Sequence, residues 1–222
     1  MPTKLSGPML APKSGVQPRY AVILLHGYGS DGADLIGLAP HWQDMLPDAL
    51  FVSPNAPEAC RINPSGYQWF DIDYEGDKLA SRQLGVAEAR PVLVEFLADL
   101  WDQTGITPQR TLLAGFSQGA MMALHVGLSL PEPLMGIIAF SGAFLPPAGF
   151  AEGRFAKPPV CLVHGDMDPV VDPELSADAD VALRLAGFDV SYHVSVGVGH
   201  GIAPDGLAFA SEFIARQLEN NP

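Results

Sequence analysis

Ser117 stands at the centre of the pentapeptide GFSQG, residues 115–119, which has the spacing Gly-x-Ser-x-Gly. A short apolar run at residues 111–114 precedes it, and the helix-favouring segment AMMAL follows it. A strand that turns sharply into a helix needs glycine on both sides, because a Cβ there would meet the neighbouring backbone. Such a turn leaves the serine hydroxyl beside a helix N-terminus, which favours developing negative charge. The sequence therefore predicts a nucleophile at Ser117; the alternative is a glycine-rich turn with an incidental serine.

A serine hydroxyl is a weak nucleophile at neutral pH and needs a base to take its proton. Of six histidines, His200 lies in a glycine-flanked loop after the last predicted strand and before the last predicted helix. That loop can bring its imidazole across the sheet edge to Ser117, so we predict His200 as the base. His26 and His164 each end a strand before a glycine, and we expect them to brace loops near the site. The others lie within predicted helices or a strand: His41, His125 and His193.

The base needs a carboxylate that fixes its tautomer and stabilises its charge. Asp166 and Asp168 both follow the predicted strand at residues 160–163. Asp168 is favoured because the proline after it restricts its backbone to extended or turn conformations, whereas Asp166 is suited to start the turn. Asp205 is expected to cap the last helix. The chain order Ser117, Asp168, His200 is the order expected for an α/β-hydrolase triad.

A tetrahedral intermediate carries a negative oxygen that hydrogen-bond donors must meet. One predicted donor is the backbone N–H of Gln118, directly after the nucleophile. The second should come from the loop after the first buried strand, where the glycines of HGYG, residues 26–29, let the backbone turn its amides inward. We predict the backbone N–H of Tyr28 as this donor. The alternative is that the loop is an ordinary strand-to-helix turn.

The elements that must position these residues alternate along the chain. Strands are predicted as uninterrupted apolar or alternating runs at residues 20–25, 50–52, 111–114, 135–140, 160–163 and 190–196. Helical spacing occurs at residues 35–42, 93–101, 120–124, 175–183 and 207–218. A kink or helix boundary is expected at Pro91. This alternation predicts an α/β fold: a mostly parallel central sheet with helices on both faces, and with reactive groups at the carboxyl ends of the strands.

Residues 60–78 show no clear periodicity, and a loop of about 20 residues inside a compact domain is often functional. This segment contains GYQWFD at residues 66–71. Its Trp69 is predicted to line a substrate groove; the alternative is that the indole pins the loop to the core.

Composition limits the partners. The 222 residues suffice for a single α/β domain over residues 1–222, with residues 1–19 expected as a loosely held lead-in. The net charge of −13 argues against nucleic acid and anionic membrane surfaces. Cys60 and Cys161 make no disulfide framework, and we expect both to be reduced. With no membrane-spanning stretch or signal-cleavage pattern, a cytoplasmic enzyme without stable membrane insertion is expected.

The motifs HGYGSDGADLIGLA, GFSQGA, HGDMDPVV and GHGI together resemble the phospholipase/carboxylesterase family of α/β-hydrolases, over residues 21–218. This family includes bacterial carboxylesterases and acyl-protein thioesterases. The resemblance implies a fold without a large cap domain, hydrolysis of esters or thioesters without cofactor or metal, and, as in several members, a homodimer. Family members often carry leucine or another apolar residue at the position of Tyr28, so a different pocket floor is expected here.

The sequence therefore predicts a serine carboxylesterase that hydrolyses short- to medium-chain acyl esters through an acyl-enzyme on Ser117. One alternative keeps this chemistry for an acyl-protein thioesterase or a lysophospholipase, which would need a long apolar channel or a lid at residues 60–78. The other is a binding protein that keeps the fold without catalysis. A pure binder has no chemical need for Ser117, Asp168 and His200 together.

Overall fold

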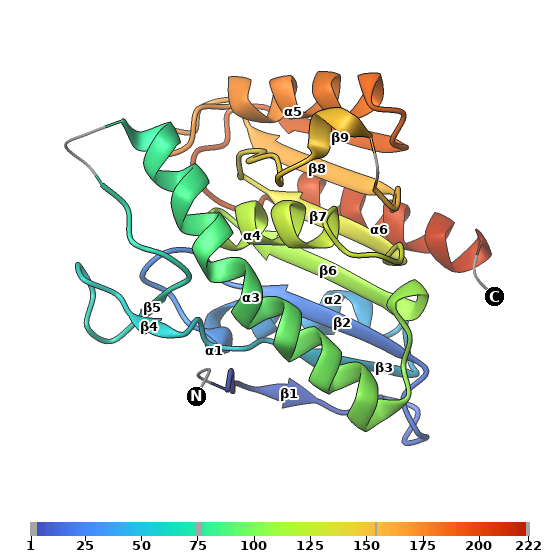
Figure 1. Ribbon diagram of the computed structural model, residues 1–222. Coiled ribbons are helices and arrows are strands. Elements are labelled where there is room, and N and C mark those ends of the chain that lie inside the picture. Colours follow the sequence, from blue (N-terminus) through green and yellow to red (C-terminus); the bar gives the residue numbers. More distant parts are fainter. Residues whose placement is uncertain (1–3, 74–76, 154, 221–222) are drawn as a thin grey trace.

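A seven-stranded sheet runs through the computed structural model, which describes residues 4–73, 77–153 and 155–220 (Figure 1). Its strands lie in the order β1-β3-β2-β6-β7-β8-β9, all parallel except β1, which pairs antiparallel with β3. Their bounds are Met9–Leu10 for β1, Tyr20–Leu25 for β2, Ala49–Val52 for β3, Thr111–Phe116 for β6, Gly136–Phe140 for β7, Val160–Gly165 for β8 and Val190–Ser195 for β9. The strand predictions are thereby confirmed, with small shifts at the ends.

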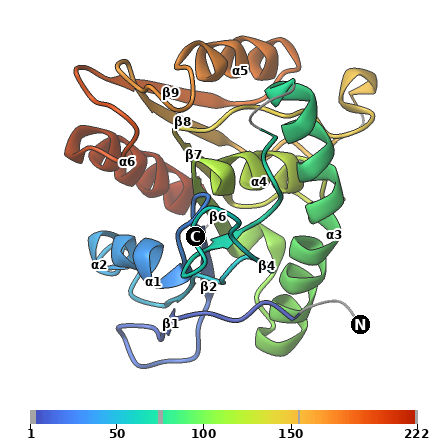
Figure 2. The ribbon, with the colours of Figure 1, turned by 90° about the vertical axis from the view of Figure 1, so that its left-hand side faces the viewer.

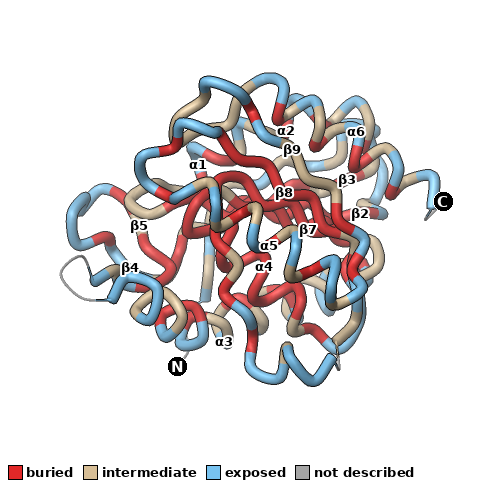
Figure 3. Tube along the Cα trace, turned by 90° about the horizontal axis from the view of Figure 1, so that it is seen from above, coloured by how far each residue is buried: buried red, intermediate tan, exposed pale blue. Residues whose placement is uncertain are grey.

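Helices cover both faces of the sheet, as predicted (Figure 2). One face carries α3 (Lys78–Thr104), α4 (Gln118–Gly127) and α5 (Glu174–Leu185), and the other carries α1 (Gly32–Leu35), α2 (Ala39–Trp42) and α6 (Pro204–Asn220). Short 3-10 helices lie at Ile36–Leu38, Pro108–Arg110 and Phe150–Glu152. Every residue of β2, β7 and β8 is buried, which explains why these strands are apolar rather than alternating, with His164 in β8 as the exception (Figure 3).

The helix α3 extends well before the boundary expected at Pro91, which lies in its interior. Its start is set instead by Asp77, whose side chain accepts hydrogen bonds from the backbone N–H groups of Leu79 and Ala80. A proline removes one backbone donor and crowds one turn, and burial of the apolar face beyond it, with Leu93 and Leu97 in the core, outweighs that cost.

Two segments expected to lack regular structure are partly ordered into strands. Within the lead-in, β1 joins the sheet edge, and Ser53 N donates to Pro8 O at 3.0 Å. Beside the long loop, β4 (Glu58–Ala59) and β5 (Tyr67–Gln68) form a small antiparallel hairpin. Residues 74–76 of that loop lie outside the described residues. Among the residues that are described, no helix has the length and apolarity needed to cross a membrane.

Candidate active site

The turn at the end of β6 has the predicted conformation. Ser117 has φ 54° and ψ −115°, and α4 begins at the next residue. A Cβ on Gly119 would lie 1.9 Å from Leu25 O, and one on Gly115 would lie 2.2 Å from Gly119 O. Both positions therefore require glycine. Ser117 N donates to Phe140 O at 2.9 Å, so the adjacent strand β7 holds the strained residue in place.

The structure brings Ser117, His200 and Asp168 together. His200 Nε2 lies 3.0 Å from Ser117 Oγ, and His200 Nδ1 lies 2.7 Å from Asp168 Oδ2. Because a carboxylate only accepts hydrogen bonds, Nδ1 carries the hydrogen and Nε2 accepts from the serine hydroxyl. The ring of Phe116 packs against the imidazole, with the ring centres 4.8 Å apart. This arrangement can take a proton from Ser117.

The side chain of Asp168 is fully buried. Its Oδ1 accepts from the backbone N–H groups of Val170 at 2.8 Å and Val171 at 3.0 Å, and its Oδ2 accepts from His200. Burial by itself disfavours the charged form, but these hydrogen bonds outweigh it, so the pKa of Asp168 is held below its ordinary value. The carboxylate is therefore charged at neutral pH.

The competing carboxylates have other partners. Asp166 is exposed, and its Oδ1 accepts from Gly197 N in the loop after β9, at 2.6 Å. Asp205 lies in the first turn of α6, where its Oδ2 is 2.8 Å from His193 Nε2. The side chain of Asp205 therefore bonds to His193 on β9, while its backbone belongs to the first turn of α6. Of the three aspartates considered, Asp168 is the one that contacts His200.

The loop after β2 lies against the nucleophile, since a Cβ on Gly27 would be 3.4 Å from Ser117 Cβ. His26 is buried; its Nδ1 donates to Gly27 O at 2.8 Å and its Nε2 accepts from Ala56 N at 2.9 Å. Burial lowers the pKa of His26, which is consistent with this neutral form. Because a trans peptide is planar, the anchored carbonyl of Gly27 fixes the opposite direction for the N–H of Tyr28.

Gln118 connects the nucleophile turn to the long loop through its side chain. Oε1 accepts from Trp69 N at 2.8 Å, and Nε2 donates to Phe70 O at 2.7 Å. Its backbone N–H is at the first position of α4, where amides have no partner within the helix. Whether this N–H and that of Tyr28 receive an oxyanion stays a prediction.

Trp69 is 2% exposed, and its Nε1 donates to His26 O at 3.0 Å. In this structure the indole pins the long loop to the core and to the loop after β2, which is the alternative role considered from the sequence. A tryptophan that is buried to this degree presents almost no surface to a ligand. Contact between Trp69 and substrate is therefore not supported by its burial and stays a prediction.

Three features of the site were not foreseen from the sequence. The first is the pair of hydrogen bonds between the Gln118 side chain and the backbone of Trp69 and Phe70. The second is Ser141, at the end of β7, which shares with Ser117 a positive φ, here 50°, and is buried. The third is the direct contact of His164 with Asp168, at 3.1 Å, beyond the bracing role expected for it. The Ser-Gly pair that follows β7 was the available signal for a second strained turn.

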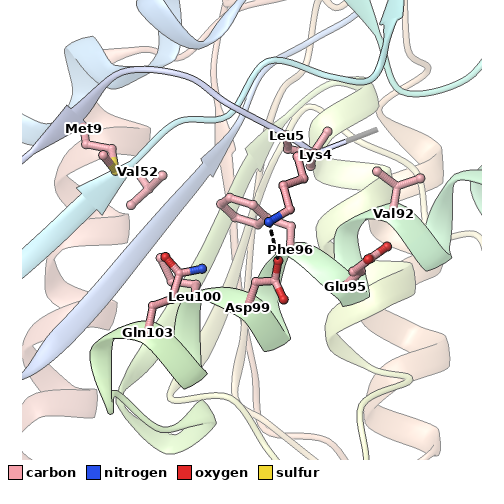
Figure 4. Close-up of a pocket in the computed structure, with 10 residues that line it drawn as sticks. All are labelled: Lys4, Leu5, Met9, Val52, Val92, Glu95, Phe96, Asp99, Leu100 and Gln103. Carbon is pink, nitrogen blue, oxygen red and sulfur yellow. Dashed lines mark ion pairs between the residues drawn. The ribbon is translucent and has the colours of Figure 1, made fainter. Parts of the chain in front are cut away.

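Two hollows lie apart from these contacts. A cavity of about 290 Å³ separates the N-terminal segment from α3, and Lys4 and Asp99 approach to 4.0 Å across it (Figure 4). A groove of about 460 Å³ lies beside α6, lined mainly by apolar residues that include Leu38, Ile202 and Leu207. None of the predicted site residues lines either hollow. Within the described ranges, no group of three or more His, Cys, Asp or Glu residues is arranged to hold a metal ion.

The parallel sheet, its two helical layers and the serine turn at the end of β6 define an α/β-hydrolase. The sequence model of the phospholipase/carboxylesterase family matches residues 11–218. The chain belongs to this family.

Similar proteins have esterase and thioesterase names. Esterase YpfH of Escherichia coli is 32% identical over 193 residues, which are 87% of this chain and 81% of the relative. Acyl-protein thioesterase 1 of Saccharomyces cerevisiae is 33% identical over 221 residues, covering 92% of this chain and 96% of the relative. Among solved structures, esterase PE8 has a TM-score of 0.92 at 53% identity and covers 96% of this chain and 99% of its own. A carboxylesterase of Bacillus cereus, at 20% identity and a TM-score of 0.76, shares the fold; the alignment covers 96% of this chain and 94% of that one.

Proposed function

We propose that the protein is a serine carboxylesterase, and that Ser117, His200 and Asp168 are its catalytic nucleophile, its base and the carboxylate that orients the base. The observation that carries the proposal is the continuous hydrogen-bond path from Ser117 Oγ through His200 to Asp168, at 3.0 Å and 2.7 Å. This path lies at the carboxyl edge of the sheet and begins at the strained residue Ser117. In this fold, the catalytic groups lie at that edge.

In the proposed first half-reaction, His200 Nε2 takes the hydroxyl proton while Ser117 Oγ forms a bond to the carbonyl carbon of the ester. The resulting oxyanion accepts hydrogen bonds from the backbone N–H groups of Tyr28 and Gln118. When the tetrahedral intermediate collapses, the bond to the alcohol oxygen breaks and His200 returns the proton to that oxygen. The alcohol leaves, and the acyl group remains on Ser117.

In the second half-reaction, a water molecule gives its proton to His200 and attacks the acyl carbonyl. When this intermediate collapses, the bond between the acyl carbon and Ser117 Oγ breaks, His200 returns its proton to Oγ, and the carboxylic acid leaves. Asp168 keeps the imidazole in the required tautomer and stabilises its positive charge during both steps. The low pKa of the Asp168 carboxyl supports this role, because the group must stay ionised while His200 is protonated.

The substrate class proposed is an ester with a short or medium acyl chain and little charge. The motif segments at residues 26–32, 115–119, 164–171 and 199–202 contain no lysine or arginine. A phosphate or coenzyme A group would therefore lack a basic partner within them. The esterase names of the YpfH and PE8 relatives support the hydrolysis of an ester.

An acyl-protein thioesterase is the second candidate, because the yeast relative with that name is 33% identical over 92% of this chain. The same three residues would serve, with a thiolate in place of the alkoxide as leaving group. A lysophospholipase would use the same residues on a third kind of substrate. All three functions need neither a cofactor nor a metal in this proposal.

For its setting, we propose a cytoplasmic enzyme, folded as one domain, that acts on dissolved small-molecule esters without stable membrane insertion or nucleic-acid binding. The net charge of −13 supports the exclusion of nucleic acid. A homodimer, which the resemblance to the family implies, is part of the proposal, and light scattering after size-exclusion chromatography measures it directly.

The test combines labelling and turnover. A fluorophosphonate probe should label the wild-type chain at Ser117, and Ser117→Ala should lose both the label and ester hydrolysis while it unfolds at a similar temperature. A series of p-nitrophenyl esters should give its highest kcat/KM at short or medium acyl length. Preferred cleavage of palmitoylated peptides or lysolipids would transfer the assignment to one of the alternatives. Labelling at another residue would reject the nucleophile.

A further inference from the structure

The carboxylate of Asp168 contacts two histidines. Its Oδ2 lies 2.7 Å from His200 Nδ1 and 3.1 Å from Nε2 of His164, a residue that the proposed reaction does not use. His164 belongs to β8 and has no solvent exposure, whereas the His200 side chain is 18% exposed. One oxygen atom therefore joins an imidazole at the site surface to another in the core.

The surroundings of His164 determine its tautomer. Nε2 lies 3.0 Å from Val171 O as well as 3.1 Å from Asp168 Oδ2, and both of these oxygens only accept. Nε2 must therefore carry a hydrogen, which the two oxygens share. Burial lowers the pKa of His164, so the ring is neutral and Nδ1 is an acceptor. The Ser176 hydroxyl lies 2.6 Å from Nδ1 and 3.1 Å from Gly142 O, and its single hydrogen is shared between these two acceptors.

Ser176 links this pair to the rest of the fold. It lies on α5, is 3% exposed, and its Oγ is also 3.1 Å from Gly142 O, just after β7. The ring of His164 is thus fixed at both nitrogens, by the loop after β8 at Nε2 and by α5 at Nδ1. Because the ring is held at both nitrogens, its Nε2–H group points in a defined direction, as it would not in a mobile side chain.

We propose that His164, oriented by Ser176, is a positioning residue that holds the Asp168 carboxylate in the plane in which Oδ2 accepts from His200. The inference rests on the proposed function, since it gives a role to a residue that does not touch the reacting atoms. The backbone N–H groups of Val170 and Val171 hold Oδ1, and His164 supplies the matching restraint on Oδ2. With both oxygens restrained, the carboxylate cannot rotate away from His200.

The principal test replaces His164 with leucine, which removes the Nε2 donor at a similar volume. His164→Leu should lower kcat by about 10- to 100-fold with KM within about twofold, because an outer hydrogen bond orients the group and does not bind substrate. In the free protein, the downfield proton resonance of the His200 Nδ1–H hydrogen bond should shift and broaden. His164→Gln, whose amide nitrogen can stand near the Nε2 position, should regain most of both.

A second variant keeps the test decisive if His164→Leu does not fold. Ser176→Ala removes the partner of Nδ1 and leaves the imidazole in place, so it should give a smaller loss of kcat and a smaller shift of the same resonance. The matched control is His125→Leu. His125 is also buried, its pKa is also lowered by burial, and its Nδ1 bonds to Leu145 O at 2.8 Å. This control should lower stability and leave kcat and the resonance unchanged.

The proposal is overturned if His164→Leu keeps the wild-type kcat and resonance, or if His125→Leu changes them equally. The resonance is recorded without substrate, so it judges the contact between His164 and Asp168 even if no ester proves to be a substrate. A wild-type chain that neither reacts with fluorophosphonate nor turns over esters refutes the proposed function instead.

Discussion

The two sides of the site are built differently. On the acid side, after β8, a fully buried carboxylate accepts from two backbone amides and two imidazoles. On the other side, residues 60–78 contribute one buried indole, Trp69, while the Arg61–Asp71 ion pair lies largely in solvent. A buried charge therefore requires a complete set of partners, whereas a surface loop needs only a few anchors. Exposed residues of the 60–78 loop can therefore be substituted without disturbing the catalytic residues.

The largest effect is predicted for a substitution on the acid side, at Asp168. Asp168→Asn should lower kcat/KM by about 10⁴-fold, because an amide cannot hold the tautomer of His200 that accepts the serine proton. Asp166→Asn, two residues away on an exposed site, should stay within about threefold of the wild type. Steady-state kinetics on one p-nitrophenyl ester decides between them. A large loss in Asp166→Asn with an active Asp168→Asn would reverse the assignment.

Acidification should affect the core more than the loop at residues 60–78, which contains no histidine. Burial lowers the pKa of His26, His125 and His164 below the ordinary value of 6.5. The unfolded chain then binds protons that the native chain does not, so stability is full above pH 6.5 and falls as pH decreases below it.

Urea unfolding at pH 7.5 and 5.5 measures this change. The slope should approach about 1.4 kcal/mol per pH unit for each histidine involved, and His125→Leu should reduce it. An unfolding free energy that is the same at both pH values would contradict the neutral assignment of these rings.

A smaller effect is expected from cutting the link between the two sides. Gln118→Ala leaves the buried Trp69 N–H and Phe70 carbonyl without their partner, which should cost about 1–3 kcal/mol of local stability. Hydrogen exchange at residues 67–71 should accelerate, and kcat/KM should fall about tenfold. Because Ser117 and His200 are untouched, fluorophosphonate labelling should persist. Complete loss of labelling would instead make this side chain part of the chemistry.

The smallest effect should come from the outer surface of the long loop. Arg61→Ala removes an ion pair whose side chains are 72% and 45% exposed, and exposed pairs of this kind contribute little. The unfolding midpoint should be unchanged within error, and kcat/KM should stay within about twofold of the wild type. A larger fall in kcat/KM would mean that this part of the loop contacts substrate. The difference between the acid side and residues 60–78 would then be smaller than described above.

The residues that could be predicted from sequence are those whose chemistry dictates their type. Ser117 needs flanking glycines, and His200 needs a loop that reaches it, so both can be recognised from local pattern. The parallel sheet followed from uninterrupted apolar runs. The burial of Trp69 and the contact between His164 and Ser176 depend on packing between distant segments, which no local pattern records. The early start of α3 was missed for a different reason: the helix begins at a local cap, Asp77, whereas the boundary was expected at Pro91.

The short strand β1 has a consequence for the solubility of the protein. It occupies the flank of β3, where it leaves no long row of unpaired backbone groups along that border of the sheet. Removal of residues 1–10 would uncover β3, with its apolar ALFV sequence, as a template for strands from other molecules. Shortened forms of the protein should therefore precipitate or self-associate at concentrations that the full chain tolerates.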